Sequence, residues 1–387
     1  MKIALVHDYL VQYGGAERVL EAFTEIFPKA PIYTMVYDEK LMNGAFSDRK
    51  IYTSFLQKIP FIGPNHRLFP LLMPMAIEQF DLSKYDVVLS DSNSYAKGVI
   101  TMPETLHITY CHTPMRYAWD DCHKYLREFK YSNITKKLVP FAMNYIRLWD
   151  KISADRPDIY VANSDFVSFR IKKYYNKDAF VINPPVSAEK FYISEKIEDY
   201  YLMIGRALPY KRFDIVIEAF NKLGLPLKII GKGPEMDKLK KNAKTNIEFL
   251  GYLDDEEISR YYSKCKAFIF PPEEDFGITP LEAMASGRPV IAFRGGGALE
   301  SVAENKTGLF FDEQTPKSIT DVIKNFNPDK FNSAEIRDHA LKFDKEIFKE
   351  KIRNFVEEKY DKKNKIQDTR TQTNSNNQIQ NHKPFVV

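Results

Sequence analysis

The sequence predicts an α/β protein built from two domains, each with a doubly wound parallel sheet. The chain has 387 residues, more than one hydrophobic core usually holds, so two domains are expected. In its second half, short apolar runs alternate with helical patterns, as they do when helices cover both faces of a parallel sheet. Its first half opens with an apolar strand, a glycine turn and an amphipathic helix.

The composition is that of an ordinary soluble globular protein, with 44% apolar, 14% aromatic and 28% charged residues. The net charge of +4 is too small to require nucleic acid as a partner, but it is compatible with a local basic face that meets phosphate. Three cysteines are an odd number in a long chain, which favours a reducing compartment. The first apolar run is too short for a signal peptide or a membrane span, so we expect a cytoplasmic protein.

Residues 1–190 are expected to form the N-terminal domain. A strand over 2–6, a turn at Gly14-Gly15 and a helix over 16–26 begin it. The helix carries its apolar residues on one face. Further strands are expected at three short apolar runs: 87–89, 107–111 and 159–161.

Residues 191–345 are expected to form the C-terminal domain. Six apolar runs predict its strands: 201–205, 227–231, 247–251, 267–270, 290–293 and 308–311. Ligands of such sheets bind beyond the carboxyl ends of the strands. Here those ends carry glycines and charged residues: Gly205-Arg206, Gly231-Lys232-Gly233 and 271–274.

The end of the chain changes character twice. Residues 333–360 have the pattern of one long or broken helix. We expect its part over 346–364 to pack back on the N-terminal domain. Residues 365–387 are polar and low in complexity, so a disordered tail is expected there.

The strongest local signal is the segment over 273–290. Thr279 is expected to be the N-cap of a helix that Pro280 opens and Gly287 closes. Free amides at such a helix start, together with the positive end of the helix dipole, predict a site for a phosphate or pyrophosphate. These amides belong to Gly277, Ile278 and Thr279.

Two carboxylates, Glu274 and Glu282, flank this predicted phosphate site. Their spacing of eight recurs elsewhere in the chain and decides nothing by itself. Their placement is more informative, because one precedes the loop and the other lies in the first turn of the helix. The alternative for Glu282 is a capping box with Thr279.

The segment over 274–290 closely resembles the motif of the retaining family 4 glycosyltransferases. Their GT-B fold has two Rossmann-like domains that face a central cleft. The resemblance extends over about residues 1–360. It includes three loops that look like the basic phosphate loop, the second nucleotide loop and the N-domain glycine loop of that family: 205–214, 231–235 and 14–17. The segments over 76–81, 90–98 and 110–120 resemble the mannosyltransferase branch used in bacterial lipopolysaccharide and O-antigen assembly.

The resemblance implies four catalytic residues: His112, Arg206, Lys211 and Glu274. Breaking the bond between sugar and nucleotide leaves negative charge on the diphosphate, which Arg206 and Lys211 would stabilise. The alternative is that both are solvated residues at a helix start. Glu274 would contact hydroxyls of the donor sugar, and His112 would bind that sugar and help to stabilise its developing positive charge.

The resemblance also implies the substrate-binding residues. Glu282 would contact the ribose, and residues Phe276 to Thr279 would contact phosphates and sugar through their backbone. Tyr252 and Leu253 would lie beside the base. The remaining expected contacts are glycines of the three loops: Gly14, Gly15, Gly231 and Gly233. Retention of anomeric configuration follows from the resemblance alone.

No metal ion or other cofactor is expected. The chain contains no Asp-x-Asp triplet that would hold a divalent ion, so the positive side chains would act alone. Two Cys-His pairs, Cys111-His112 and Cys122-His123, raise the alternative of a metal site. Neighbouring residues of a strand point to opposite faces, and the spacing matches no common zinc pattern, which argues against that alternative.

An apolar and basic segment over 55–80 could rest on a membrane that holds a lipid-linked acceptor. Three prolines prevent a regular spanning helix there. Interior packing is the preferred interpretation.

We therefore expect a retaining transferase that moves a hexose, preferably mannose from GDP-mannose, to a saccharide or lipid-linked saccharide in cell-surface polysaccharide assembly. It would work in the cytoplasm or at the inner face of the cytoplasmic membrane, without nucleic acid. The alternatives are a transferase with a UDP-sugar donor, a nucleotide-sugar epimerase of the same architecture, and an inactive binding module.

Overall fold

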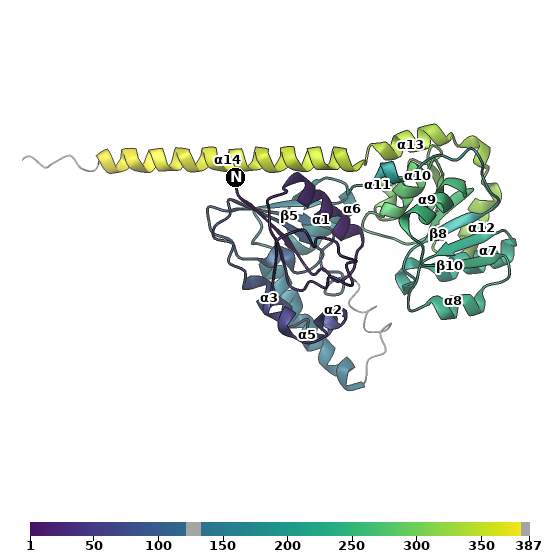
Figure 1. The fold of residues 1–387 in the computed structure, drawn as a ribbon, viewed down its shortest axis with the longest axis horizontal. Helices are drawn as coiled ribbons and strands as arrows, with labels where there is room; N and C mark the ends of the chain where they lie inside the picture. Colours follow the sequence, from purple (N-terminus) through teal and green to yellow (C-terminus); the bar gives the residue numbers. More distant parts are fainter. Residues whose placement is uncertain (121–132, 381–387) are drawn as a thin grey trace, which may run out of the picture.

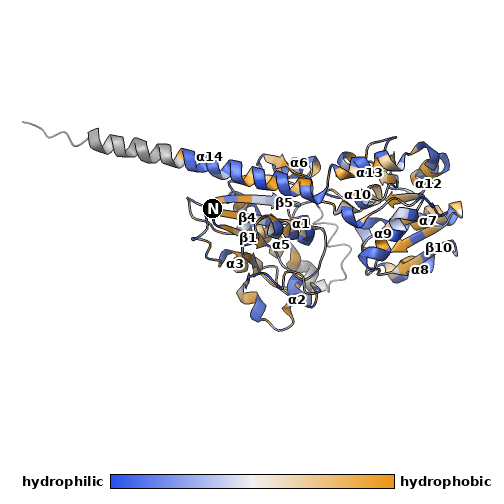
Figure 2. Ribbon diagram, turned by 45° about the horizontal axis from the view of Figure 1, so that its top comes forward, coloured by the Kyte–Doolittle hydropathy of each residue, from blue (hydrophilic) through white to orange (hydrophobic). Residues whose placement is uncertain are grey.

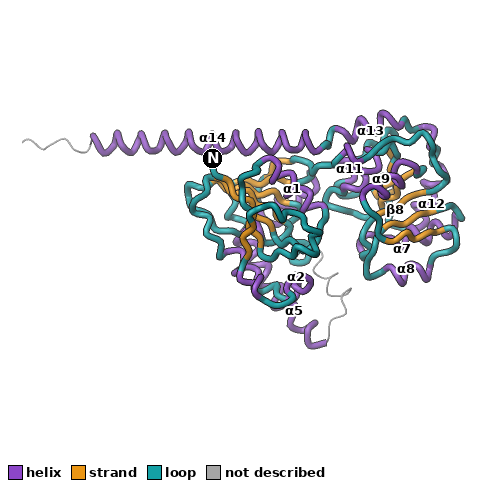
Figure 3. The backbone as a smooth tube through the Cα atoms, viewed as in Figure 1, coloured by secondary structure: helices purple, strands orange, loops and turns teal. Residues whose placement is uncertain are grey.

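The computed structural model describes residues 1–120 and 133–380, with side chains for 1–120 and 139–366. Two domains lie side by side, and the last helix runs along the N-terminal one (Figure 1). Each domain has a sheet at its centre with helices around it (Figure 3). The predicted α/β class with two parallel-sheet domains is confirmed.

The N-terminal domain contains seven parallel strands in the order β3-β2-β1-β4-β5-β6-β7. Their bounds are β1 Ile3–His7, β2 Ile32–Thr34, β3 Ile51–Thr53, β4 Val87–Ser92, β5 Leu106–Cys111, β6 Ile159–Ala162 and β7 Ala179–Val181. The helices around them are α1 Gly15–Ile26, α2 Ile62–Asn65, α3 Met73–Glu78, α5 Asn133–Ser153 and α6 Asp165–Tyr175. In the register of β1 and β4, His7 lies beside Asp91.

The C-terminal domain contains six parallel strands in the order β10-β9-β8-β11-β12-β13. Their bounds are β8 Tyr201–Ile204, β9 Leu227–Ile230, β10 Ile247–Gly251, β11 Ala267–Phe270, β12 Val290–Phe293 and β13 Gly308–Phe311. The helices are α7 Phe213–Leu223, α8 Met236–Asn242, α9 Asp255–Lys264, α10 Ile278–Ala285, α11 Ala298–Ser301, α12 Pro316–Asn325 and α13 Ser333–Leu341.

The central strands are buried along their whole length, because helices cover both faces of each sheet. All residues of β1, β4, β5 and β11 are buried. The strand order reverses between β1 and β4 in the first sheet and between β8 and β11 in the second. Such reversals leave a crevice beyond the carboxyl ends of the strands, where ligands of these folds bind.

Helix α10 begins two residues before the predicted position. Its N-cap is Gly277 rather than Thr279, and the φ of Gly277 is 86°. A Cβ at Gly277 would also lie 2.7 Å from the ring of Phe270. Glycine therefore permits a tight turn that places Thr279 inside the helix, and the expectation of a Thr279 cap was wrong.

The last predicted helix is broken into α13 and α14, Lys345–Gln380. Phe348, Ile352 and Val356 of α14 are buried in the core of the N-terminal domain. The part of α14 that is coloured in Figure 2 is otherwise mostly hydrophilic. The segment contains neither Gly nor Pro, so the helix continues into the region where we expected a disordered tail. Residues 381–387 of that expected tail lie outside the described part.

Candidate active site

A cavity of about 470 Å³ lies between the two domains, at the carboxyl ends of both sheets. This volume suits a small-molecule ligand. The described residues that line it come from both domains: Gly15, Ala16, Asn93, His112, Arg116, Asn163, Pro184, Tyr210, Lys211 and Glu274 to Thr279.

Lys211 and Glu274 form an ion pair in this cavity, between Nζ and Oε1. Lys211 ends a short 3-10 turn after β8, and Glu274 lies in the loop between β11 and α10. Burial lowers the pKa of Lys211, but the charge of Glu274 outweighs it and raises that pKa above its usual value. Lys211 therefore stays protonated at neutral pH and can bind an anionic ligand.

The start of α10 faces the same cavity. Gly277, Ile278 and Thr279 line it, and the first amides of a helix have no partners within the helix. The positive end of the helix dipole adds to their attraction for an anion. Phe276 also lines the cavity, while its side chain is buried in the core beneath. The predicted phosphate site thus lies beside Lys211.

Glu282 lies on α10 but outside the cavity lining. Its Oε1 accepts a hydrogen bond from Nη1 of Arg18 at 2.5 Å, and its Oε2 accepts one from the Tyr262 hydroxyl at 2.9 Å. The alternative of a capping box with Thr279 is wrong, because Thr279 is not the N-cap. A buried carboxylate needs such donors, and here one of them comes from the other domain.

Arg206 is exposed at the end of β8 and lies outside the cavity lining. Its Nη1 is 3.4 Å from Oε1 of Gln12 in the N-terminal domain. Tyr252 is 68% exposed, with Nζ of Lys232 over its ring. Leu253 packs against the core of the C-terminal domain. Arg206, Tyr252 and Leu253, which were all expected at the substrate site, therefore do not line the cavity.

Two of the predicted glycines bring loops together. A Cβ on Gly231 would lie 1.9 Å from the carbonyl oxygen of Gly205, and one on Gly233 would lie 2.5 Å from that of Ala207. Both therefore allow the loops after β8 and β9 to touch. Of the pair in the first glycine loop, Gly15 lines the cavity, and the amide of Gly14 donates to Oε2 of Glu17 at 2.8 Å.

His112 lines the cavity from the N-terminal domain and is buried. Its Nε2 forms a hydrogen bond with Oδ1 of Asp91. The other oxygen, Oδ2, is 2.9 Å from Nδ1 of His7. The sequence analysis missed Asp91 and His7. His7 ends β1 and Asp91 is the second-last residue of β4, which was a usable signal, but the register that joins them is not visible in the sequence.

Asp275 is a third residue of the site that was not predicted from the sequence. Its carboxylate accepts hydrogen bonds from Arg116, at 3.1 and 2.9 Å, and from Nη1 of Arg170 at 2.6 Å. Its backbone oxygen accepts one from Ser164 at 2.6 Å. The hydroxyl of Thr113 also donates to the carboxylate, at 3.1 Å. All four donor residues lie in the N-terminal domain, so Asp275 holds the loop of Glu274 against that domain.

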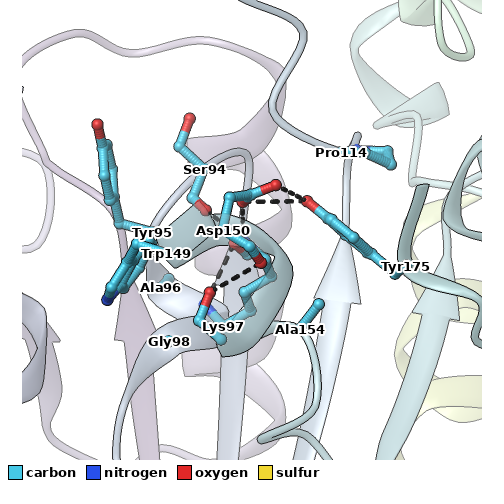
Figure 4. A network of polar contacts seen from close by, with 12 residues as sticks. Ser94, Tyr95, Ala96, Lys97, Gly98, Pro114, Trp149, Asp150, Ala154 and Tyr175 are labelled. Carbon is cyan, nitrogen blue, oxygen red and sulfur yellow. Dashed lines mark hydrogen bonds and ion pairs between the residues drawn. The ribbon is translucent and has the colours of Figure 1, made fainter. Parts of the chain in front are cut away.

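The loop that carries Asn93 is fixed from two sides. Asp8 accepts hydrogen bonds from four consecutive backbone amides, those of Asn93 to Ala96, at 2.6 to 2.8 Å. Beneath it, buried Lys97 forms an ion pair with Asp150 of α5 and donates to the carbonyl oxygen of Ser94 at 2.6 Å (Figure 4). Two networks therefore define this wall of the cavity.

Comparison with known proteins identifies a family match over the C-terminal domain. Residues 188–347 match the family described as "Glycosyl transferases group 1". These residues include the loop of Lys211 and the segment from Glu274 to Glu282.

Three relatives are similar in sequence. The uncharacterized glycosyltransferase MJ1178 of Methanocaldococcus jannaschii is 29% identical over 49% of this chain and 54% of its own. The alpha-1,3/1,6-mannosyltransferase ALG2 of Dictyostelium discoideum is 23% identical over 87% of this chain and 92% of its own. The O-antigen chain mannosyltransferase C of Escherichia coli is 27% identical over 46% of this chain and 50% of its own. The chain thus spans about half the length of two of these relatives.

Two solved structures share the whole fold. Anabaena HepE in complex with UDP has a TM-score of 0.69 at 16% identity, over 92% of this chain and 100% of that one. Sucrose-phosphate synthase from Thermosynechococcus elongatus has a TM-score of 0.69 at 15% identity, over 93% and 99%. The two-domain architecture is therefore that of GT-B glycosyltransferases.

Proposed function

We propose that this chain is a retaining glycosyltransferase that moves mannose from GDP-mannose to a saccharide or lipid-linked saccharide. One observation carries the proposal: Lys211, Glu274 and the start of α10 meet in a cavity between the domains, opposite His112. A cation and free helix amides suit a diphosphate, and a carboxylate beside them suits sugar hydroxyls.

In this reaction the bond between the anomeric carbon and the diphosphate breaks, an acceptor hydroxyl forms a new bond to that carbon on the same face, and the proton of the hydroxyl passes to the leaving diphosphate. Negative charge grows on the diphosphate, where Lys211 and the amides of Gly277 to Thr279 stabilise it. Glu274 exchanges part of its contact with Lys211 for hydroxyls of the donor sugar. His112 holds the sugar from the opposite wall, where the N-terminal domain admits the acceptor.

The choice of mannose rests on the relatives, several of which are named mannosyltransferases. A UDP-sugar donor is the alternative, since HepE was solved with UDP and with UDP-glucose. The test is to incubate the protein with GDP-mannose and with UDP-hexoses and to measure nucleoside diphosphate release with and without acceptors.

We expect release from GDP-mannose that depends on an acceptor, and a product that keeps the anomeric configuration by NMR. If nucleoside diphosphate is released only from UDP-hexoses, the donor is a UDP-sugar and not GDP-mannose. An epimerised sugar nucleotide formed without acceptor would favour the epimerase, and no turnover of any donor would overturn the proposal.

We further propose that turnover needs no divalent ion, because Lys211 and the amides of α10 supply the positive charge at the leaving group. Activity should survive EDTA. A complete loss that Mg²⁺ or Mn²⁺ restores would contradict this part of the proposal.

An exposed apolar surface on the N-terminal domain supports the lipid-linked acceptor. Among the described residues, no helix has the length and hydropathy needed to span a bilayer. Helices α3 and α5 both contact the short 3-10 turn Ala96–Gly98 and lie with α2 in the part of the domain away from α14 (Figure 1). Large apolar side chains of this region are 57 to 84% exposed, among them Phe61, Leu68, Met75, Phe141 and Leu148.

Such side chains beside basic residues suit the surface of an anionic membrane. Replacing Phe61 and Leu68 with Ser should weaken binding to anionic vesicles. The matched control is Phe169→Ser, since Phe169 is 70% exposed on α6. Equal binding of all variants would argue against membrane contact through this surface.

A further inference from the structure

A row of buried polar side chains connects two walls of the cavity through the core of the N-terminal domain. It consists of Glu17, His7, Asp91 and His112, which are 5, 0, 0 and 8% exposed. At one end, Glu17 holds the amide of Gly14, next to the cavity residue Gly15. At the other end, His112 lines the cavity itself.

The contacts along the row are close. Nε2 of His7 is 3.6 Å from Oε1 of Glu17, and Nδ1 of His7 is 2.9 Å from Oδ2 of Asp91. The other oxygen of Asp91 meets Nε2 of His112. Asp91 therefore lies between two imidazoles, with one oxygen toward each.

Charge decides the direction of these hydrogen bonds. Burial lowers the pKa of His7, but Asp91 and Glu17 outweigh burial and raise it to about 10. Burial raises the pKa of Asp91, but the two imidazoles outweigh it and lower that pKa. His7 is thus a cation at neutral pH and Asp91 an anion. An ionised carboxylate only accepts hydrogen bonds, so His112 must carry a hydrogen on Nε2.

We propose that His7 and Asp91 are positioning residues, which keep a hydrogen on Nε2 of His112, so that in the neutral form of the ring Nδ1 is the atom that accepts a hydrogen bond from a donor-sugar hydroxyl. The activity part of this inference rests on the proposed transferase function. The part that concerns the His112 ring depends only on the buried contacts of Asp91 and on its negative charge.

Neighbouring groups fix both the backbone and the ring of His112. Its backbone amide donates to the carbonyl oxygen of Ser92 at 2.9 Å, and its ring packs edge-on against Tyr110. With the opposite tautomer, a lone pair on Nε2 would face the anion of Asp91. In the transfer reaction, the anion behind the ring also favours positive charge that develops on the sugar.

The tautomer can be tested without any substrate. In protein labelled with ¹⁵N-histidine, the ring spectrum of His112 shows which nitrogen carries hydrogen. We expect hydrogen on Nε2 in the native protein. Asp91→Asn keeps the shape of the side chain but offers an amide donor, so the hydrogen should move to Nδ1.

His7→Gln is the second variant. It keeps the inference testable if Asp91→Asn does not fold. The amide of Gln can still donate to Asp91, so the His112 spectrum should stay native, whereas His7→Leu removes that donor and should disturb it. The matched control is Ser90→Ala on the neighbouring position of β4. Ser90 contacts buried His107 at 2.9 Å on the opposite face of the sheet.

Kinetics give the second readout. Asp91→Asn should lower kcat by on the order of 10²-fold or more while the KM for the donor changes little, as expected for a wrong tautomer. Ser90→Ala should retain native kcat. Hydrogen that stays on Nε2 in a folded Asp91→Asn variant, or native kcat in that variant, would overturn the inference. If the native protein turns over no donor, the transferase proposal fails, and the ring spectra alone decide the inference.

Discussion

Arg18 of the N-terminal domain donates a hydrogen bond to Glu282 of the C-terminal domain, with 2.5 Å between Nη1 and Oε1. The charge of Glu282 raises the pKa of Arg18 above its already high value. In the proposed reaction, the ribose of the donor would compete with Arg18 for this carboxylate. Contact between the domains and nucleotide binding would therefore use the same side chain.

Glu282→Gln tests that competition. The amide oxygen of Gln can still accept a hydrogen bond from Tyr262, so the fold should survive. Loss of the charged acceptor should raise the KM for the donor by on the order of tenfold. Initial rates at varied donor concentration give the result, with Glu350→Gln on the exposed face of α14 as control. An unchanged KM for the donor would show that Glu282 does not contribute to nucleotide binding.

Lys211→Ala should lower kcat/KM by about 10² to 10³-fold, because it removes one preplaced charge from the leaving diphosphate. The control is Lys222→Ala, which breaks an exposed ion pair with Glu218 on α7. Such surface pairs contribute only about 0 to 1 kcal/mol to stability. Steady-state rates equal to those of the control would contradict the role of Lys211.

Lys97→Met should destabilise the protein by about 3 to 5 kcal/mol, because Asp150 then remains as a buried charge without its cation. Asp150 would keep only neutral donors, Trp119 at 2.7 Å and Tyr175 at 3.0 Å. Adding Asp150→Asn should recover part of the loss. Urea denaturation measures both variants. A double variant that is no more stable than Lys97→Met would show that charge burial is not the cause.

The stability contributed by His7 should depend on pH. Its pKa is raised from 6.5 to about 10 in the folded protein, so folding favours its protonated form. This contribution is fully present below pH 6.5 and is lost as pH rises toward 10. The difference in unfolding free energy between the native protein and His7→Gln should therefore shrink over that range. A difference that stays constant or grows with pH would disagree with a protonated His7.

The sequence predicted the fold class and most of the long strands, because buried parallel strands are short apolar runs with clear ends. It missed β2, β3 and β7, each of three residues. A strand of that length shows too little periodicity to be recognised. The start of α10 was misplaced because Thr279 looks like a cap, whereas the positive φ of Gly277 decides where the helix begins.

The candidate site was predictable where it depends on strand ends. His112, Lys211 and Glu274 each follow a strand, and the fold brings them to one cavity. The partners Asp91 and His7 are 84 residues apart, and only the register of β1 and β4 joins them. Asp275 accepts hydrogen bonds from Arg116 and Arg170, and these contacts form only when the two domains come together.

The buried side chains Phe348, Ile352 and Val356 also affect the order of folding. They belong to the core of the N-terminal domain, yet they follow the entire C-terminal domain in the chain. During synthesis the first domain therefore leaves the ribosome with part of its interior still missing, and the second domain can fold before the first is complete. The domain that emerges first therefore completes its core only after Val356 has been translated.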